Sequence, residues 1–199
     1  QIYVQQLLCK QEGYPLYYPE PPANLPLENR KRGVSIGDVG IIKVDGKFQF
    51  AFNIFMRWTG TNDEINCFGV PDHFEPLQFN QHHVECLPNK REKKSELMSK
   101  GVERNEASAN VKTAVLTMPD GAMGEDYCDI ASIRSYSIAN AMSWYKFINR
   151  TLGREAPNGS LYVATGCDKS AAWGIATMGE ASSSQTFSLQ FTAVKASIG

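Results

Sequence analysis

Five side chains of the types that bind metal ions lie close together in the sequence. Cys67, His73, His82, His83 and Cys86 fall within 20 residues, a stretch that contains all three histidines of the chain. Zinc is bound tetrahedrally by cysteine and histidine, and structural zinc sites usually take them from closely spaced pairs. The spacings here match none of the common paired patterns. We therefore interpret these residues as loop histidines and buried thiols, and we predict no metal and no other cofactor.

The best candidate for a nucleophile is Cys167 in the stretch TGCDKS. Lys169 would lower the pKa of this thiol if the two side chains met, and a general base would have to come from a distant histidine. Thiols in strand-rich segments are more often small core residues. We predict that the protein is not an enzyme, and we keep chemistry at Cys167 or at a histidine-bound metal as an alternative.

The sequence contains no phosphate-binding loop, dinucleotide fingerprint, nucleophile elbow or HExxH motif. Its most suggestive glycine pair, in Gly37-Asp38-Val39-Gly40, is not followed by a helical pattern. These glycines instead predict a bulge or a close backbone approach within a strand.

The clearest structural signal is a β-hairpin over residues 34–56. Asp45-Gly46 predicts a two-residue type I′ turn, because both central positions of that turn need φ > 0. This turn would place Ile41 opposite Phe50 and Val39 opposite Phe52. Side chains alternate between the two faces of a strand, so one face would be apolar: Val39, Ile41, Phe48, Phe50, Phe52 and Ile54. That face needs a cover within the protein or in a membrane.

A helix and further strands follow. Apolar residues recur at helical spacing from Asp129 to Leu152, namely Ile130, Ile133, Ile138, Ala141, Trp144, Tyr145, Ile148 and Leu152, with Gly153 suited to end the helix. Strands are predicted at 111–118, 161–178 and 186–194, the first stopped by Pro119-Asp120-Gly121. We expect an α+β fold with a twisted, mostly antiparallel sheet covered by the 129–152 helix.

Composition suggests one globular domain over residues 1–199, with 42% hydrophobic and 21% charged residues. Residues 14–32, which are rich in proline, should form an extended arm. The charged segment 90–112 is interpreted as a solvated strand, a mobile loop or a weak helix. A net charge of −1 provides no overall attraction to nucleic acid. Five widely spread cysteines and no recognisable signal peptide favour a soluble, cytoplasmic protein with free thiols.

Most of the chain resembles an uncharacterised protein family of mushroom-forming (basidiomycete) fungi. The segments that carry this resemblance are LYYPEP, LPLENRKRGVSIGDVGIIKVDGKFQFAFNIF, LTMPDGA, SWYKFINRTLGREAPNGSLYVATGCDKSAAWGIA and FSLQFTA. The order of elements is also similar to the pore-forming domain of gasdermins: an early hairpin, an aromatic loop, a charged segment, a strand, a helix and an apolar strand reading LYVATG.

The gasdermin resemblance implies a membrane-targeting, pore-forming protein of defence or cytolysis that assembles as a homo-oligomer on acidic lipid membranes. Phe55, Met56 and Trp58 would dip into lipid. The basic residues Lys90, Arg91, Lys93 and Lys94 would lie near acidic headgroups, where each is worth about 1 kcal/mol. An alternative is a non-enzymatic binding or scaffold module that uses the aromatic loops and the YPEPP stretch as its partner surface.

Overall fold

The computed structural model describes residues 2–8, 13–60, 65–91, 95–105 and 108–178. The chain divides into two compact units: unit 1 comprises 1–17, 87–124 and 168–199, and unit 2 comprises 18–86 and 125–167. The single domain expected over 1–199 stays a prediction.

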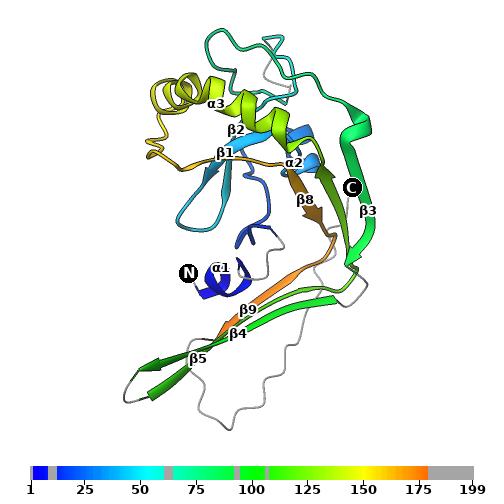
Figure 1. Cartoon of the computed structure of the whole chain (residues 1–199), viewed down its shortest axis with the longest axis vertical. Helices are drawn as coiled ribbons and strands as arrows, with labels where there is room; N and C mark the ends of the chain where they lie inside the picture. The colour runs from blue at the N-terminus through cyan, green and yellow to red at the C-terminus, as the bar shows by residue number, and fades with distance from the viewer. Residues whose placement is uncertain (1, 9–12, 61–64, 92–94, 106–107, 179–199) are drawn as a thin grey trace. The chain divides into compact units, whose positions relative to one another are not determined.

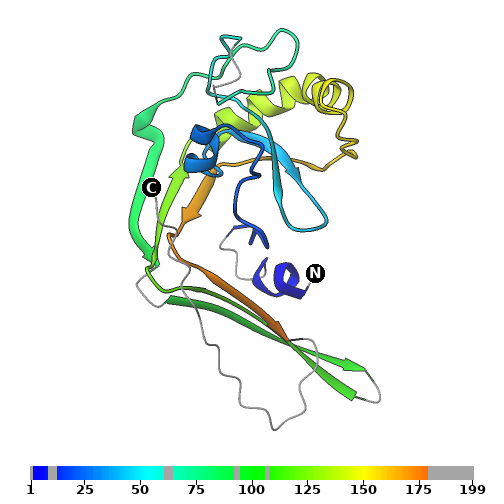
Figure 2. The same ribbon diagram turned by 180° about the vertical axis from the view of Figure 1, so that it is seen from behind.

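Unit 2 is built from a short hairpin and a long helix. Strands β2, β1 and β7 form a sheet in that order, with both neighbouring pairs antiparallel. Figures 1 and 2 show α3 running along β1 and β2. The elements are α2 (Leu27–Arg32), β1 (Asp38–Ile42), β2 (Phe48–Asn53), the 3-10 turn η1 (Gln81–His83), α3 (Ile130–Lys146), the π-helical turn η2 (Phe147–Thr151) and β7 (Leu161–Val163).

The hairpin turns through three residues rather than two. The amide of Lys43 donates to the carbonyl of Lys47, and the amide of Gly46 donates to the carbonyl of Lys43. Gly46 has φ of 84°, while Asp45 has no positive φ. The predicted type I′ turn is therefore wrong, although its place is right. A three-residue loop that ends on a left-handed glycine is the next commonest hairpin connection.

A β-bulge farther along the hairpin compensates for the extra residue of the turn. Gly40 pairs with Phe50 and Val39 pairs with Phe52, so Ala51 has no partner on β1. The predicted pairing of Val39 with Phe52 is confirmed. Because an unpaired residue reverses the alternation of side chains, the two phenylalanines point to opposite faces of β2.

Between turn and bulge the register differs by one from the predicted one. Ile41 pairs with Gln49, not with Phe50. Gly40 is glycine for a steric reason, since a Cβ there would lie 2.5 Å from the carbonyl oxygen of Gln49 and 2.6 Å from the ring of Phe48. The close backbone approach predicted for these glycines is thus confirmed at Gly40.

Phe50 and Phe52 are both buried, as predicted, but in different surroundings. The ring of Phe52 lies 5.4 Å from that of Trp144, on the helix side of the sheet. The ring of Phe50 lies 6.5 Å from that of Phe68 and 5.8 Å from the guanidinium carbon of Arg32. The prediction that one apolar face carries both phenylalanines is therefore wrong.

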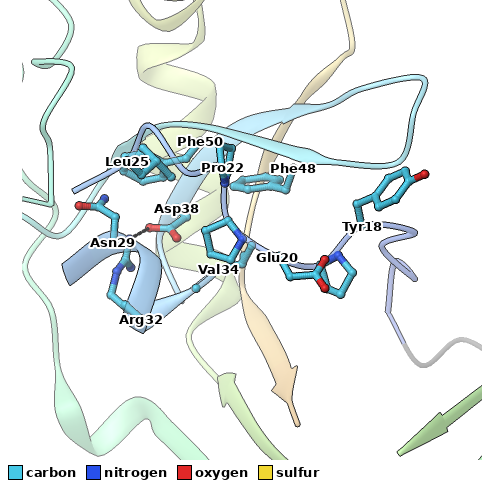
Figure 3. A pocket seen from close by; sticks show the side chains of 13 residues that line it. Tyr18, Glu20, Pro22, Leu25, Asn29, Arg32, Val34, Asp38, Phe48 and Phe50 are labelled. Carbon is cyan, nitrogen blue, oxygen red and sulfur yellow. Dashed lines mark hydrogen bonds and ion pairs between the residues drawn. The ribbon is translucent and has the colours of Figure 1, made fainter. Parts of the chain in front are cut away.

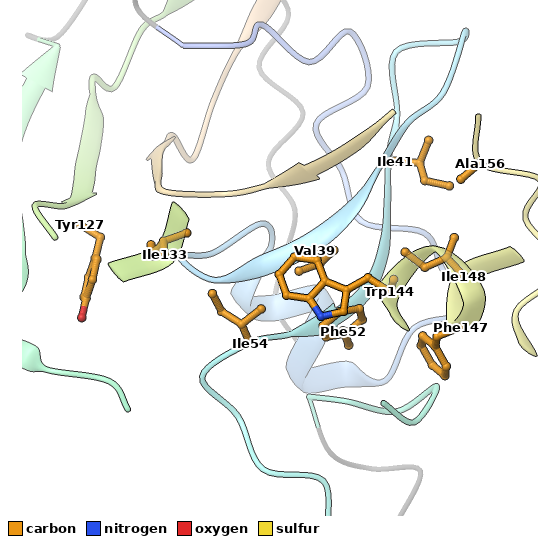
Figure 4. Close-up of a cluster of buried hydrophobic side chains, with 11 residues drawn as sticks. Val39, Ile41, Phe52, Ile54, Tyr127, Ile133, Trp144, Phe147, Ile148 and Ala156 are labelled. Atoms are coloured by element: carbon orange, nitrogen blue, oxygen red, sulfur yellow. The ribbon is translucent and has the colours of Figure 1, made fainter. Parts of the chain in front are cut away.

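The core of unit 2 lies between this sheet and α3. Figure 4 shows Trp144 and Ile148 of the helical segment together with Val39 and Phe52 of the hairpin. The buried cluster consists of Val39, Ile41, Ala51, Phe52, Ile54, Tyr127, Ile133, Trp144, Phe147, Ile148 and Ala156. The helix therefore covers this sheet, as the apolar pattern predicts.

Helix α3 and the π-helical turn η2 together span the predicted range, although α3 itself ends at Lys146, and the buried face differs from the predicted stripe. Asp129 caps α3, accepting from the amide of Ser132 at 3.1 Å. Ile138 is 73% exposed. Ser137 and Asn140, both half-buried, lie on the inward side instead. Their side chains donate to helix carbonyls four residues earlier, so their polar groups are satisfied without water.

The loop after α3 returns to the hairpin. Gly153 has φ of 61°, as expected of a residue that ends a helix. Arg154 then donates to the carbonyls of Gln49 and Phe50 on β2, and its guanidinium carbon lies 5.0 Å from the ring centre of Phe68. This arginine therefore connects the loop after α3 with strand β2.

The predicted extended arm is shorter than 14–32. Residues 13–16 and several that follow lack regular structure, but Leu27–Arg32 forms helix α2 directly after Pro26. The missing amide hydrogen of proline costs nothing before a first helical turn, whose amides have no intrahelical partner. The composition of LENRKR favours a helix once the prolines end.

Unit 1 contains a long antiparallel hairpin. Strands β4 (Ser95–Asn105) and β5 (Ser108–Met118) pair along their whole length, and β9 (Gly174–Met178) pairs antiparallel with β5. Helix α1 (Ile2–Leu8) buries Tyr3 and Leu7 in a cluster with Ala114. The strand at 111–118 is confirmed, and much of the charged segment 90–112 is strand. The predicted strand 186–194 lies outside the described residues.

A further sheet has the order β3 (Val84–Arg91), β6 (Ala122–Tyr127) and β8 (Gly166–Lys169), and each of these strands has residues in both units. The predicted strand 161–178 is thus three strands, β7, β8 and β9. The fold is mixed α and β, with antiparallel sheets and one long helix. Among the described residues, no helix is long and apolar enough to cross a membrane.

Candidate functional site

The segment that follows β2 presents apolar side chains at the surface. Met56 is 44% exposed and Trp58 is 47% exposed. Arg57 between them is also exposed. We call residues 56–60 the Met56 loop. Phe55, which was predicted to dip into lipid with them, is half-buried, with its ring 5.1 Å from Phe79 and 5.3 Å from Tyr127.

Two buried asparagines hold the base of the Met56 loop. The side-chain oxygen of Asn66 accepts from the amide of Asn53 at 2.6 Å, and its nitrogen donates to the carbonyl of Met56 at 2.7 Å. Asn53 accepts from the amide of Phe55 at 2.9 Å. Both asparagines are almost fully buried. Because every one of these bonds is to main chain, they fix the path of the loop before any partner binds.

The polar network continues to a buried ion pair. Asn53 donates to Asp38 at 2.8 Å, and Arg32 donates to the same carboxylate oxygen at 2.9 Å. Asp38 is 1% exposed. Burial raises the pKa of the Asp38 carboxyl, against the opposing effects of Arg32, of Asn53 and of the Ser35 amide. Removing one partner of a buried pair leaves the other charge uncompensated, which gives this network a structural role.

A small hollow, partly open to solvent, lies between the proline-rich segment and the hairpin. We call it the arm pocket. As Figure 3 shows, Asn29, Arg32 and Asp38 gather at one end and Tyr18 lies at the other. Its lining residues are Tyr18, Pro19, Glu20, Pro21, Pro22, Leu25, Asn29, Arg32, Gly33, Val34, Asp38, Phe48 and Phe50. Its walls are therefore mostly apolar, with polar groups at one end.

The polar end of the arm pocket has unpaired groups. The side-chain oxygen of Asn29 and the Nε of Arg32 are buried and have no hydrogen-bond partner among the residues that the structure describes. The same Asn29 donates from its nitrogen to the carbonyl of Ile65 at 2.9 Å, which fixes the orientation of the amide. Tyr18 closes the other end, with its amide 3.4 Å from the Gly46 carbonyl and its ring 5.0 Å from the amine of Lys47.

The five residues considered as metal ligands do not form a site. Within the described part of the chain, no three His, Cys, Asp or Glu side chains are grouped to hold a metal ion. His83 instead lies 3.6 Å from Asp129 and 3.4 Å from Asn80. Burial raises the pKa of the Cys67 thiol, which disfavours the thiolate that a metal requires.

Cys167, the candidate nucleophile, is half-buried on β8. Its sulfur lies 4.0 Å from a carboxylate oxygen of Glu125. A carboxylate is therefore a direct neighbour of this thiol. Chemistry at Cys167 stays a prediction.

The structure describes two of the four residues of the basic run. Lys90 and Arg91 lie in strand β3, where the structure describes their main chain but not their side chains. Lys93 and Lys94 lie outside them altogether. Their role at headgroups stays a prediction.

Asn53 and Asn66, which position the Met56 loop, were not predicted from the sequence. Asn53 ends a strand and Asn66 lies in an irregular stretch, so neither interrupts a pattern. No protein-family model matches the sequence, and neither the curated proteins nor the solved structures include a match. The resemblances to a fungal family and to gasdermins stay predictions from the sequence.

Proposed function

We propose that this protein binds the surface of lipid membranes through the Met56 loop, and that acidic lipids favour the binding. One observation carries the proposal: a methionine and a tryptophan, each a little under half exposed, flank an exposed arginine on a loop held by buried asparagines. Tryptophan and arginine are side chains that settle at the membrane interface.

The free energy gained by inserting Met56 and Trp58 into the membrane is too small for tight binding. Fully burying a large apolar side chain gains about 1.5–3 kcal/mol, so two that are a little under half exposed gain on the order of 2 kcal/mol together. That alone gives weak, reversible binding. Basic residues near an acidic surface add about 1 kcal/mol each. The proposal therefore requires Arg57 or the run Lys90, Arg91, Lys93 and Lys94 to contribute.

The finer proposal is a gasdermin-like pore formed by several copies on the membrane. It is supported by the resemblance in element order and by the β4–β5 hairpin, whose strands have 11 residues each. A strand of about 9–11 residues is long enough to cross the hydrocarbon layer. Release of a trapped dye from liposomes tests this step separately from binding.

Cosedimentation with liposomes tests the binding step. We expect Trp58→Ala to weaken binding at every salt concentration, because apolar transfer is not screened. Replacing the four basic residues by Glu should weaken binding to anionic liposomes most at low salt, because screening already weakens charge attraction at high salt. Trp173→Ala, at another exposed tryptophan, is the matched control. The proposal is refuted if the parent protein binds neither neutral nor anionic liposomes at low salt.

The arm pocket supports a second candidate function, a non-enzymatic binding module. The observation that favours it is the pair of unpartnered buried polar atoms at the polar end, on Asn29 and Arg32. Each buried polar atom without a hydrogen bond costs free energy, and a bound partner that supplied the hydrogen bond would remove this cost. Phe48→Ala would enlarge the pocket without touching the Met56 loop, so it should alter partner binding in this function and leave liposome binding unchanged.

A further inference from the structure

An exposed turn in unit 2 carries a chemically reactive pair of residues. Asn158 is the only asparagine in the sequence that is followed by glycine. It is exposed and lies in the loop before β7. The amide of Ser160 donates to the carbonyl of Pro157 at 3.1 Å, and Gly159 has φ of 80° while Asn158 has no positive φ. These values define a type II turn with Asn158 and Gly159 at its two central positions.

We propose that Asn158 is a site of spontaneous deamidation whose rate is set by the hydroxyl of Tyr145. In this reaction the Gly159 nitrogen loses its proton and attacks the side-chain carbonyl carbon of Asn158. A carbon–nitrogen bond forms, the bond to the side-chain nitrogen breaks, and ammonia leaves. Water then opens the cyclic imide at either carbonyl, giving aspartate or its β-linked isomer, so water is the only co-reactant.

Glycine at position 159 leaves the attack open. Within the described ranges of the chain, a Cβ built on Gly159 would have no heavy atom within 4 Å, apart from its chain neighbours. The attacking nitrogen therefore has no side chain of its own residue in the way. Exposure of Asn158 also lets water reach the imide and lets ammonia leave.

Two hydrogen bonds oppose the attack. The amide of Gly159 donates to the hydroxyl oxygen of Tyr145 at 2.7 Å, and the amide of Ser160 closes the turn. The nitrogen must give up the Tyr145 contact before it can bond to the Asn158 side chain. The Tyr145 hydroxyl thus slows the reaction by stabilising the unreacted turn.

Asn149, in the preceding π-helical turn, is an internal control. Its side-chain oxygen accepts from the amide of Ala156, and its nitrogen donates to the carbonyl of Ala156 at 3.0 Å. The residue that follows it is Arg150, whose side chain hinders ring closure. We expect Asn149 to stay intact while Asn158 reacts.

The test incubates the folded full chain at mildly alkaline pH and follows Asn158 and Asn149 by peptide mass mapping. The synthetic peptide Ala-Pro-Asn-Gly-Ser gives the unrestrained rate. We expect conversion at Asn158 that is slower than in the peptide, and a rate about two- to tenfold higher in Tyr145→Phe, the range that one hydrogen bond provides. Circular dichroism confirms that this variant is folded.

Three results would overturn the proposal. If Asn158 stays unmodified in both proteins while the peptide is fully converted, Asn158 is not a deamidation site. If parent and Tyr145→Phe react equally fast, the hydroxyl does not control the rate. If Asn149 reacts as fast as Asn158, the turn has no special reactivity.

Discussion

Truncating Phe52 to alanine should destabilise unit 2 strongly. Its side chain is 0% exposed, and its ring lies within 6 Å of the rings of Phe74, Trp144 and Phe147. Removing a buried phenylalanine costs about 3–5 kcal/mol, through lost transfer free energy and the cavity left behind. Three aromatic neighbours fixed by their own packing leave little freedom to collapse, so we expect the upper half of that range. A domain is stable by only about 5–15 kcal/mol in total.

Phe50→Ala is the matched comparison, because the bulge places the two rings on opposite faces of β2. Phe50 borders the arm pocket, so water can enter the space that its ring leaves, and we expect a smaller loss. Urea unfolding followed by tryptophan fluorescence measures both losses, because Trp144 is 3% exposed and its emission should shift on unfolding. Equal midpoints for the parent and Phe52→Ala would refute the described register, and a larger loss for Phe50→Ala would refute the assignment of faces.

Two further predictions concern the hairpin and the helix. Gly40→Ala should lower the free energy of unfolding by about 1–3 kcal/mol, because its methyl group would overlap the Gln49 carbonyl and the Phe48 ring. The control is Val44→Ala, at a fully exposed position, which should change the unfolding midpoint little. Burial, with a smaller contribution from Glu75, raises the pKa of Tyr136 to about 12. Since an unfolded tyrosine titrates near pH 10, the unfolded state loses this proton first, and stability should fall as pH rises from about 10 toward 12. Tyr136→Phe should reduce that fall in urea unfolding series, and an unchanged slope would contradict the shift.

The structural features that were predicted correctly from the sequence are the ones set by neighbouring residues. The place of the hairpin turn, the start of the helix at Asp129, the glycine at 153 and the turn at Pro119-Asp120-Gly121 were all recognisable, because each depends on a few neighbouring residues. The number of residues in the hairpin turn could not be predicted from the sequence. Asp-Gly suits a two-residue turn and also the end of a three-residue turn, and the hydrogen bond between Lys43 and Lys47 shows that the three-residue turn forms.

The features that depend on distant residues could not be predicted. Ile138 fits a helical stripe by spacing, yet it is exposed because the sheet lies under the neighbouring face of α3. The candidate site depends on Asn66, whose partners are 10 and 13 residues away. The exposure of Met56 and Trp58 was part of the gasdermin resemblance, whereas the packing of Phe55 against Phe79 needed the fold.

The contact between Arg154 and β2 has a consequence for assembly. β2 is the outermost strand of its sheet, and an edge strand with unoccupied carbonyls is a template on which another chain can add a strand and start aggregation. The guanidinium of Arg154 donates to the carbonyl of Phe50, and the ring of Phe68 lies against it. Arg154 therefore acts as a gatekeeper. Its replacement by a smaller residue would leave a phenylalanine-rich edge open to uncontrolled strand addition, even where the folded unit survives.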